Sequence, residues 1–127
     1  MIFKVNDGKE QWNVEVKNAK NFGSHYELRL SARGSGITVF FGHASYGQWF
    51  IAVPDWEASV VVGNLQDTYY AAEKLGRAME SEIDGWSVAA ALIAYAKQEG
   101  INEVDGHQEV LDEMKAAGYV IIDPEDN

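Results

Sequence analysis

The chain has 127 residues and a formal net charge of −10, with 46% apolar residues, two prolines and no cysteine. A chain of this length fits one domain that buries roughly two-thirds of its unfolded surface. The lack of cysteine excludes disulfides and thiolate metal sites, and the apolar content excludes a disordered chain. No apolar run spans a bilayer and the first residues lack a signal-peptide core, so we expect a cytoplasmic protein without membrane contact.

Apolar and polar residues alternate along the first sixty residues, as they do in strands with one buried face. Between residues 11 and 17, Trp12, Val14 and Val16 fall on one face, and the residues between them are polar. Similar runs separated by glycine-containing turns predict an antiparallel meander with strands at 11–17, 25–31, 37–41 and 49–53, an edge strand at 2–5 and a further strand at 59–62. The glycines after Arg33 are interpreted as a hairpin turn, not a phosphate loop, because no helix follows them.

After Gly63 the apolar period changes from two residues to nearly four. This pattern predicts helices at 66–79, at 88–98 with Ser87 as its cap, and at 106–117, where Gly118 suits a left-handed end. Residues 119–122 are predicted as a last strand. The sequence thus predicts one α+β domain, an antiparallel β-meander of about five strands followed by three helices on one face, with a strand-rich half at 1–62, a helical half at 63–122 and an acidic tail at 123–127.

Negative charge is concentrated in the second part of the chain. Residues 1–50 carry six basic and four acidic side chains, a net of +2, whereas residues 51–127 carry four basic and sixteen acidic ones, a net of −12. Such a field repels nucleic acid and attracts basic surfaces. We therefore expect no direct nucleic acid binding, and a partner with a basic surface.

The third predicted helix separates charged from apolar side chains. Glu109, Asp112 and Glu113 fall within an arc of about 100°, and Val110 and Met114 lie outside it. One interpretation is a solvated face that only aids solubility. The other is an imitation of a phosphate backbone that docks in a cleft lined by Lys and Arg.

Further carboxylates continue between the predicted helices, with only Lys97 and Lys115 near them in sequence. An aromatic residue, Trp56, follows a predicted strand end, where it either packs in the core or is exposed and anchors a partner. The predicted partner-binding residues are accordingly Glu80, Glu82, Asp84, Glu99, Glu103, Asp105, Glu109, Asp112, Glu113 and Trp56.

Catalytic and metal-binding patterns are weak. The three histidines lack the short spacing of a metal site, and no nucleophile elbow accompanies a Ser-His-Asp set drawn from Ser45, His43 and Asp55. We expect no enzyme activity, cofactor or metal. The alternative is a sheet-based ligand- or peptide-binding module, or a small enzyme, whose pocket gathers His25, Arg33, His43, Asp55 and Trp56.

Several stretches together resemble an uncharacterised family of small proteins carried largely by Firmicutes genomes and their phages and mobile elements. The resemblance covers roughly residues 12–95 and rests on Gly23–Glu27, Ser31–Gly42, Pro54–Trp56, Asn64-Leu65 with Asp67, Glu73–Leu75, Asp84-Gly85, Val88-Ala89 and Ala91-Leu92. The turn at Ser31–Gly36 is longer than the Ser-Arg-Ser pattern typical of the family. The acidic segment from about Gln98 onward is an addition to the common core.

The resemblance implies an accessory gene on mobile DNA but supplies no activity, catalytic residue or cofactor. Small acidic proteins from that context are often inhibitors of host defence, including anti-CRISPR proteins. Resemblance and charge together predict a protein that blocks a nucleic-acid-handling host enzyme, with a CRISPR effector nuclease as the most concrete target. A homo-oligomeric structural protein whose charge only keeps it soluble is a third reading.

Overall fold

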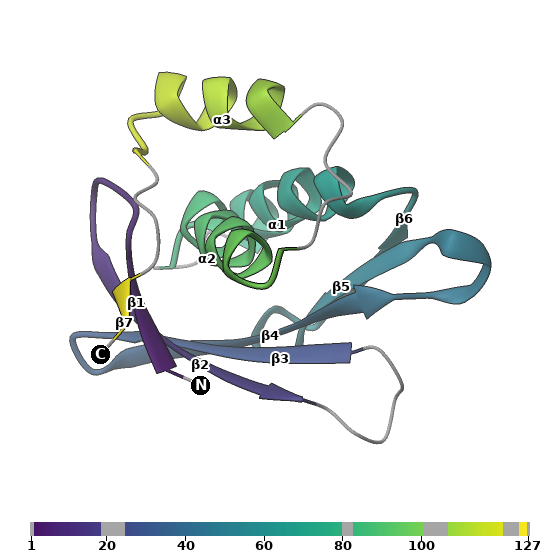
Figure 1. Cartoon of the computed structure of the whole chain (residues 1–127), viewed down its shortest axis with the longest axis horizontal. Helices are drawn as coiled ribbons and strands as arrows, with labels where there is room; N and C mark the ends of the chain where they lie inside the picture. Colours follow the sequence, from purple (N-terminus) through teal and green to yellow (C-terminus); the bar gives the residue numbers. More distant parts are fainter. Residues whose placement is uncertain (1, 19–24, 80–82, 101–106, 121–124, 127) are drawn as a thin grey trace.

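A computed structural model of the chain describes residues 2–18, 25–79, 83–100, 107–120 and 125–126. Its elements form three layers (Figure 1). The helices α1 (Leu65–Met79) and α2 (Gly85–Gln98) cover one face of an antiparallel sheet, and α3 (His107–Ala116) lies on the outer side of this pair. The predicted α+β fold is confirmed. None of the helices in the described segments has the length and apolar character needed to cross a bilayer.

Six strands follow one another as an antiparallel meander, and a seventh joins from the end of the chain. They are β1 (Ile2–Asn6), β2 (Gln11–Asn18), β3 (His25–Ala32), β4 (Ser35–His43), β5 (Trp49–Val53), β6 (Ala58–Val62) and β7 (Glu125–Asp126). The order in the sheet is β6-β5-β4-β3-β2-β1-β7. The predicted edge strand at 2–5 is therefore paired on both sides, with β2 and with β7.

The turn between β3 and β4 is shorter than predicted. Arg33 and Gly34 have φ angles of 52° and 81°, and Ala32 pairs with Ser35 across them. Two residues at positive φ form the hairpin turn whose twist matches that of its strands. Because the turn uses only two residues, β4 begins at Ser35, and Gly36 lies within the strand.

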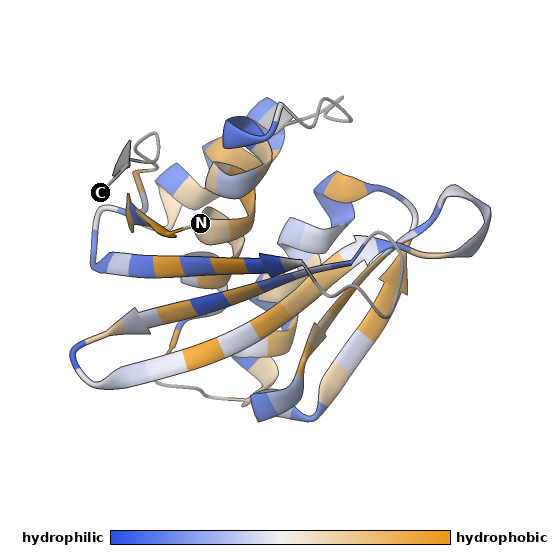
Figure 2. Ribbon diagram, turned by 60° about the horizontal axis from the view of Figure 1, so that its bottom comes forward, coloured by the Kyte–Doolittle hydropathy of each residue, from blue (hydrophilic) through white to orange (hydrophobic). Residues whose placement is uncertain are grey.

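The alternating pattern of the strands places one apolar face against the helices. Trp12, Val14 and Val16 of β2 are buried, and the residues between them face away from the core. Figure 2 shows the same alternation of hydrophobic and hydrophilic positions along neighbouring strands. The sheet's inner face and the helices α1 and α2 thus share one hydrophobic core.

Helices α1 and α2 approach each other closely at two glycines. A Cβ atom on Gly85 would lie 2.4 Å from the carbonyl oxygen of Ala72, and one on Gly76 would lie 2.7 Å from the Cα of Gly85. The predicted apolar stripe of α1 is buried at its start, where Leu65 and Tyr69 have no exposed surface, but Met79 at its end is 47% exposed. The two glycines thus bring the second half of α1 into close contact with the start of α2.

Helix α2 begins earlier than predicted and has a different cap. Asp84 is the N-cap residue, and its Oδ1 accepts a hydrogen bond of 2.9 Å from the backbone N–H of Trp86. The predicted cap, Ser87, lies inside the first turn, is only 4% exposed, and donates its own N–H to the carbonyl of Asp84. All residues from Ser87 to Ala96 are buried, as the near-continuous Ala, Leu and Ile content predicts.

Helix α3 ends as the glycine predicts. Gly118 has a φ of 93°, the N–H of Tyr119 donates to the carbonyl of Met114, and the N–H of Gly118 donates to that of Lys115, a Schellman motif. The predicted strand at 119–122 is wrong for its first two residues, which form no strand, and residues 121–122 lie outside the described segments. The last strand is instead β7, inside the stretch predicted as a free tail.

The two edges of the sheet differ in charge and length. The edge strand β7 has two residues, both acidic. The opposite edge strand, β6, has five residues and no charged side chain, and Val60 and Val61 are 36% and 54% exposed. No strand in the described part of the chain pairs with the outer edge of β6.

Candidate functional site

The predicted partner-binding carboxylates that the structure describes lie at three separate places. Four of them, Glu80, Glu82, Glu103 and Asp105, lie outside the described residues. Asp84 precedes α2 and Glu99 follows it, so these two are roughly 20 Å apart along the helix axis. The remaining three lie together on α3: Glu109, Asp112 and Glu113.

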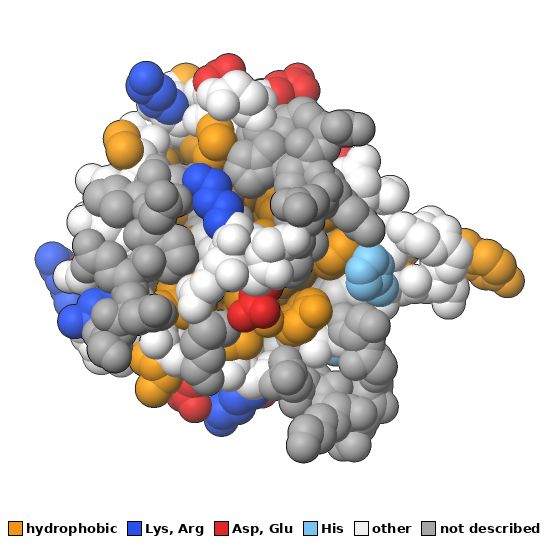
Figure 3. Space-filling view, viewed as in Figure 1, with side chains coloured by type: hydrophobic (Ala, Val, Ile, Leu, Met, Phe, Trp, Pro, Cys, Tyr) orange, Lys and Arg blue, Asp and Glu red, His pale blue; other side chains and the backbone are white. Residues whose placement is uncertain are grey.

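The outer side of α3 carries these three carboxylates. Glu109, Asp112 and Glu113 are exposed, whereas Val110 and Met114 are fully buried. The separation of charged and apolar faces predicted for this helix is confirmed. Figure 3 shows carboxylates along the top of the molecule, where α3 lies, and others scattered lower on the same face. We call the exposed residues Glu109, Asp112 and Glu113 the α3 acidic face.

A pair of aromatic side chains from the inner helices adjoins the α3 acidic face through Tyr70, which hydrogen-bonds Glu113. Tyr70 of α1 and Trp86 of α2 are half-buried, and their ring centroids are 6.4 Å apart in an edge-on arrangement. Partial burial raises the pKa of the Tyr70 hydroxyl, as do its hydrogen bond to Glu113 and the negative charges of Glu113 and Glu109. The phenol is therefore held protonated beside two carboxylates.

Trp56 does not form an exposed anchor, which corrects one prediction. Its side chain is only 5% exposed and lies in η3, a 3-10 turn at Pro54–Trp56 that ends at Glu57 in the left-handed region, with a φ of 49°. The turn folds the indole against α1, where the Cη2 atom would lie 3.0 Å from a Cβ on Gly76. Trp56 is a core residue because the absence of a side chain at Gly76 leaves space for its ring.

The predicted strand-end pocket is not assembled. His25 and His43 contact aromatic rings of β5, with centroid separations of 4.4 and 4.0 Å. Arg33 follows the other end of β3, eight residues from His25, which is about 25 Å along a strand. Asp55 accepts a hydrogen bond of 3.4 Å from the backbone N–H of Thr38, near the middle of β4. The interpretation of these residues as one cluster was wrong.

The Ser-His-Asp set considered from sequence is likewise not brought together. Ser45 lies in η2, the 3-10 turn at Ser45–Gly47, whereas Asp55 lies in η3 at the far end of β5. The described residues contain no group of three His, Asp or Glu side chains that could hold a metal ion. The side chain of His107 lies outside what the structure describes.

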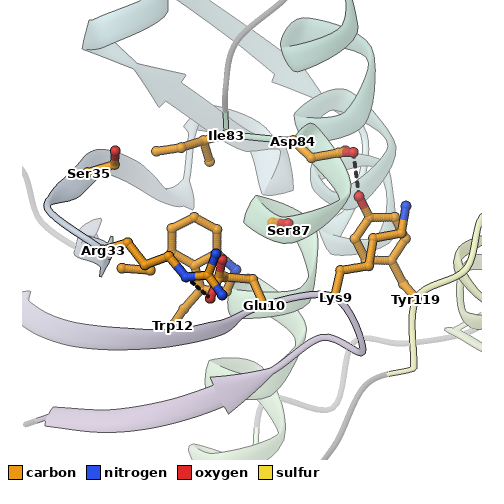
Figure 4. A pocket seen from close by; sticks show the side chains of 10 residues that line it. Lys9, Glu10, Trp12, Arg33, Ser35, Ile83, Asp84, Ser87 and Tyr119 are labelled. Carbon is orange, nitrogen blue, oxygen red and sulfur yellow. Dashed lines mark hydrogen bonds and ion pairs between the residues drawn. The ribbon is translucent and has the colours of Figure 1, made fainter.

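A pocket of about 340 Å³ lies at the end of the sheet opposite to the histidines. The turn between β1 and β2, the turn between β3 and β4, the start of α2 and the residue after Gly118 surround it (Figure 4). Its lining combines four charged side chains with aromatic and aliphatic ones: Lys9, Glu10, Trp12, Ala32, Arg33, Ser35, Ile83, Asp84, Ser87 and Tyr119. We call this the sheet-end pocket.

A buried carboxylate organises one wall of the sheet-end pocket. Asp7 has no exposed surface, and its Oδ1 accepts hydrogen bonds of 2.9 and 2.8 Å from the backbone N–H groups of Lys9 and Glu10. Its Oδ2 accepts a 3.0 Å hydrogen bond from the indole Nε1 of Trp12. Asp7 therefore fixes both the turn that carries Lys9 and the orientation of the Trp12 ring.

The opposite wall joins the start of α2 to the end of the α3 segment. The hydroxyl of Tyr119 donates a hydrogen bond to Oδ2 of Asp84, and the Lys9 ammonium lies 4.2 Å from the centre of the Tyr119 ring. Burial raises the pKa of the Tyr119 hydroxyl, and the hydrogen bond to Asp84 and the charge of Asp84 raise it further. The hydroxyl thus stays protonated and keeps donating to Asp84.

The sequence analysis singled out two residues of this pocket, Arg33 and Asp84, as candidate site residues, but gave them other roles. It missed Lys9 and Tyr119 and interpreted Trp12 as core only. The Asx-type turn at Asp7 was the available local signal, because a short carboxylate before Gly and Lys commonly folds a turn. The contact between Lys9 and Tyr119 joins residues 110 positions apart, and no local pattern predicts such a pairing.

Residues 1–100 match a family of unknown function, DUF6618. No curated protein and no solved structure matches the chain. The matched range contains the sheet-end pocket apart from Tyr119, and it ends before α3. The expectation of an uncharacterised family is confirmed, whereas the mobile-element context and the inhibitory role stay predictions.

Proposed function

Since the chain belongs to DUF6618, a family of unknown function, we propose a function from its own surfaces. The protein is a non-enzymatic binding protein that docks the α3 acidic face on a basic, nucleic-acid-binding surface of a host protein. The observation that carries this proposal is the exposure of Glu109, Asp112 and Glu113 on one side of a helix, with half-buried Tyr70 beside Glu113 and Trp86 packed against Tyr70.

Charge density supports this choice of partner. Three carboxylates within about 100° of one short helix present several negative charges over roughly 6 Å of axis, and duplex DNA presents one per roughly 1.7 Å. Lys115 is the only lysine or arginine in α3. The face therefore complements a channel of Lys and Arg residues and favours fast, electrostatically steered association.

The aromatic border supports a protein partner over a purely solubilising role. Tyrosine and tryptophan are enriched among the residues that dominate binding energy at protein interfaces. Tyr70 and Trp86 retain exposed surface although α1 and α2 bury most of their other apolar residues. A partner that covers both rings would add desolvated contacts to the charge pairs formed by Glu109 and Glu113.

The resemblance to proteins of mobile elements favours a defence nuclease as the partner. The test is DNA cleavage by a guide-loaded, Cas9-type nuclease with increasing amounts of the protein. We expect inhibition at low salt that weakens strongly toward 0.5 M salt, because exposed charges are screened over about 8 Å at physiological ionic strength and over less at higher salt. Excess target DNA should compete with the protein for the channel.

Charge-reversal variants distinguish docking through the α3 acidic face from a general effect of the protein's net charge. The triple variant Glu109→Lys, Asp112→Lys and Glu113→Lys is expected to lose inhibition and keep its fold. The control variant Glu15→Lys, Glu27→Lys and Glu57→Lys changes the net charge equally at positions outside α3, and it is expected to inhibit normally. Normal inhibition by the α3 variant, or equal loss in both variants, would exclude docking through α3.

A further inference from the structure

We infer that the sheet-end pocket binds a small molecule that combines a flat ring with an anionic group, a carboxylate or a phosphate. The pocket is separate from the α3 acidic face, and nothing in the proposed partner binding uses it. Its volume of about 340 Å³ lies at the lower end of the range for small-molecule sites, roughly 300–1,000 Å³.

The ring is expected to lie against Trp12. The only polar atom of the indole, Nε1, is bonded to Asp7, so the part of the ring that reaches the pocket is apolar carbon. Ile83 and the Tyr119 ring add apolar surface from two other segments, and Figure 4 shows these three side chains around one space. Offset stacking and edge contacts on such a surface favour a flat, apolar group.

We infer that the ligand carries a negative charge from the charged atoms of the pocket that already have partners. Both oxygens of Asp84 accept hydrogen bonds, from Trp86 and Tyr119. Oε1 of Glu10 contacts the Arg33 Nε at 3.5 Å and accepts the N–H of Gln11. Both carboxylates are thus already engaged by donors of the protein itself.

The cations, in contrast, retain free donors. Among the described residues, no carboxylate lies within 4.0 Å of the Lys9 ammonium, which lies 4.2 Å from the centre of the Tyr119 ring. The guanidinium of Arg33 uses Nε for Glu10 and leaves its two terminal nitrogens for another acceptor. In Figure 4 the Arg33 side chain reaches Glu10 at the Trp12 ring, whereas the Lys9 side chain extends along Tyr119, so the two cations border different parts of the pocket.

A second hollow of about 310 Å³ lies on the outer face of the sheet at the same hairpin turn and shares Ala32, Arg33 and Ser35 with the first. Its lining adds Arg29, Ser31 and Asn13 and contains no carboxylate. Arg29 is held in place by a 3.0 Å hydrogen bond to the hydroxyl of Thr38. Arg33 therefore borders the sheet-end pocket on one side of the hairpin turn and this second hollow on the other.

The walls are already fixed without a ligand. Asp7 fixes the first turn, the two-residue turn at Arg33 and Gly34 fixes the second, and Asp84 caps α2. The Ser87 hydroxyl, buried in the first turn of α2, hydrogen-bonds the Tyr119 hydroxyl and so adds to this wall. Binding therefore requires ordering of the Lys9 and Arg33 side chains only, which limits the loss of conformational entropy.

The experiment is a titration of the full chain, labelled with nitrogen-15, followed by amide chemical shifts. One arm uses adenosine and guanosine monophosphates and triphosphates, and the other uses indole-3-acetate and benzoate. Adenosine and indole test the ring without charge, and inorganic phosphate and acetate test the charge without a ring. We expect the ligands of one arm to cause saturable shifts at residues 9–12, 33–35, 84–87 and 119. Their binding should be at least about tenfold tighter than that of either control set.

Three variants locate the binding. Arg33→Gln and Lys9→Gln remove exposed cations of the pocket and are each expected to weaken the anionic ligand about tenfold. Lys74→Gln removes an exposed cation of α1 and is expected to bind normally, and the spectra themselves report whether each variant is folded. Binding in the nucleotide arm identifies phosphate as the anion, and binding in the other arm identifies carboxylate.

Several outcomes would overturn the inference. One is the absence of saturable shifts at the pocket with both arms at millimolar ligand. Another is binding of the uncharged rings as tightly as their anionic counterparts. A third is normal binding by both Arg33→Gln and Lys9→Gln.

Discussion

Helices α2 and α3 differ in how much of their surface is buried. Helix α2 lies beside α1 in the layer between the sheet and α3, and every residue from Ser87 to Ala96 is buried. Helix α3 buries Val110 and Met114 and exposes its carboxylates. The first helix belongs to the residues matched by the family and the second lies beyond them. The difference indicates that α2 holds the domain together, whereas α3 adds a charged surface to a fold that is already closed.

The largest expected effect comes from truncation of a buried side chain in α2. Leu92→Ala leaves a cavity in the core, because Leu92 has no exposed surface, and is expected to lower the free energy of unfolding by about 2–5 kcal/mol. The matched variant Leu111→Ala on α3 removes the same atoms from a half-buried position, with an expected loss of about 1 kcal/mol. Urea denaturation measures both, and equal losses would contradict the distinction between the two helices.

A smaller effect is expected where α2 meets α1. In Gly85→Ala the new methyl would lie 2.4 Å from the carbonyl oxygen of Ala72 and 2.6 Å from the Cα of Glu73. Backbone atoms yield little, so the helices must separate, and we expect a loss of about 1–3 kcal/mol. Alanine is otherwise the better helix former, by about 1 kcal/mol. The direction of the change in melting temperature therefore tests the close contact. A stabilised variant would mean that the helices are not in close contact here.

The smallest effect concerns the bond that ties the end of the α3 segment to the start of α2. Tyr119→Phe removes the hydroxyl that donates to Asp84, with an expected loss of about 1–2 kcal/mol at neutral pH.

The contribution of this hydroxyl to the free energy of unfolding changes with pH only in alkaline solution. The pKa of Tyr119 in the folded protein is raised above its ordinary value of 10.0, so the stabilisation is complete below pH 10 and is lost as the pH rises further. The gap between wild type and Tyr119→Phe should be constant from pH 7 to 9 and shrink above pH 10. Denaturation at pH 8 and pH 10.5 tests this, and a gap that widens in alkali would contradict the assigned donor.

Local patterns in the sequence were sufficient for most of the fold. The alternation at Trp12, Val14 and Val16 predicts both the strand and its buried face, and Pro54 marks the end of β5. Gly118 predicts the end of α3, because only a left-handed residue closes that turn. The start of α2 was misplaced because Ser87 and Asp84 both suit an N-cap. Only the packing of Ser87 against neighbouring chain segments decides between them.

The candidate site was predicted less well, for a physical reason. The α3 acidic face follows from helical spacing alone, since Glu109, Asp112 and Glu113 need no distant partner to share a side. The sheet-end pocket depends on contacts between Lys9, Arg33, Asp84 and Tyr119, which are distant in sequence. Trp56 shows the converse problem. Its place after a strand end indicates exposure, and only the missing side chain at Gly76 explains its burial.

The uncharged edge strand β6 has a consequence for handling the protein. Valine-rich strands with an open edge readily pair with other chains, and the overall charge of −10 keeps molecules of this protein apart at neutral pH. That repulsion disappears as the pH approaches the isoelectric point of about 4.6. We therefore expect precipitation or fibre growth to begin from Ala58–Val62 in mildly acidic buffer, and a single lysine at Val61 to delay it.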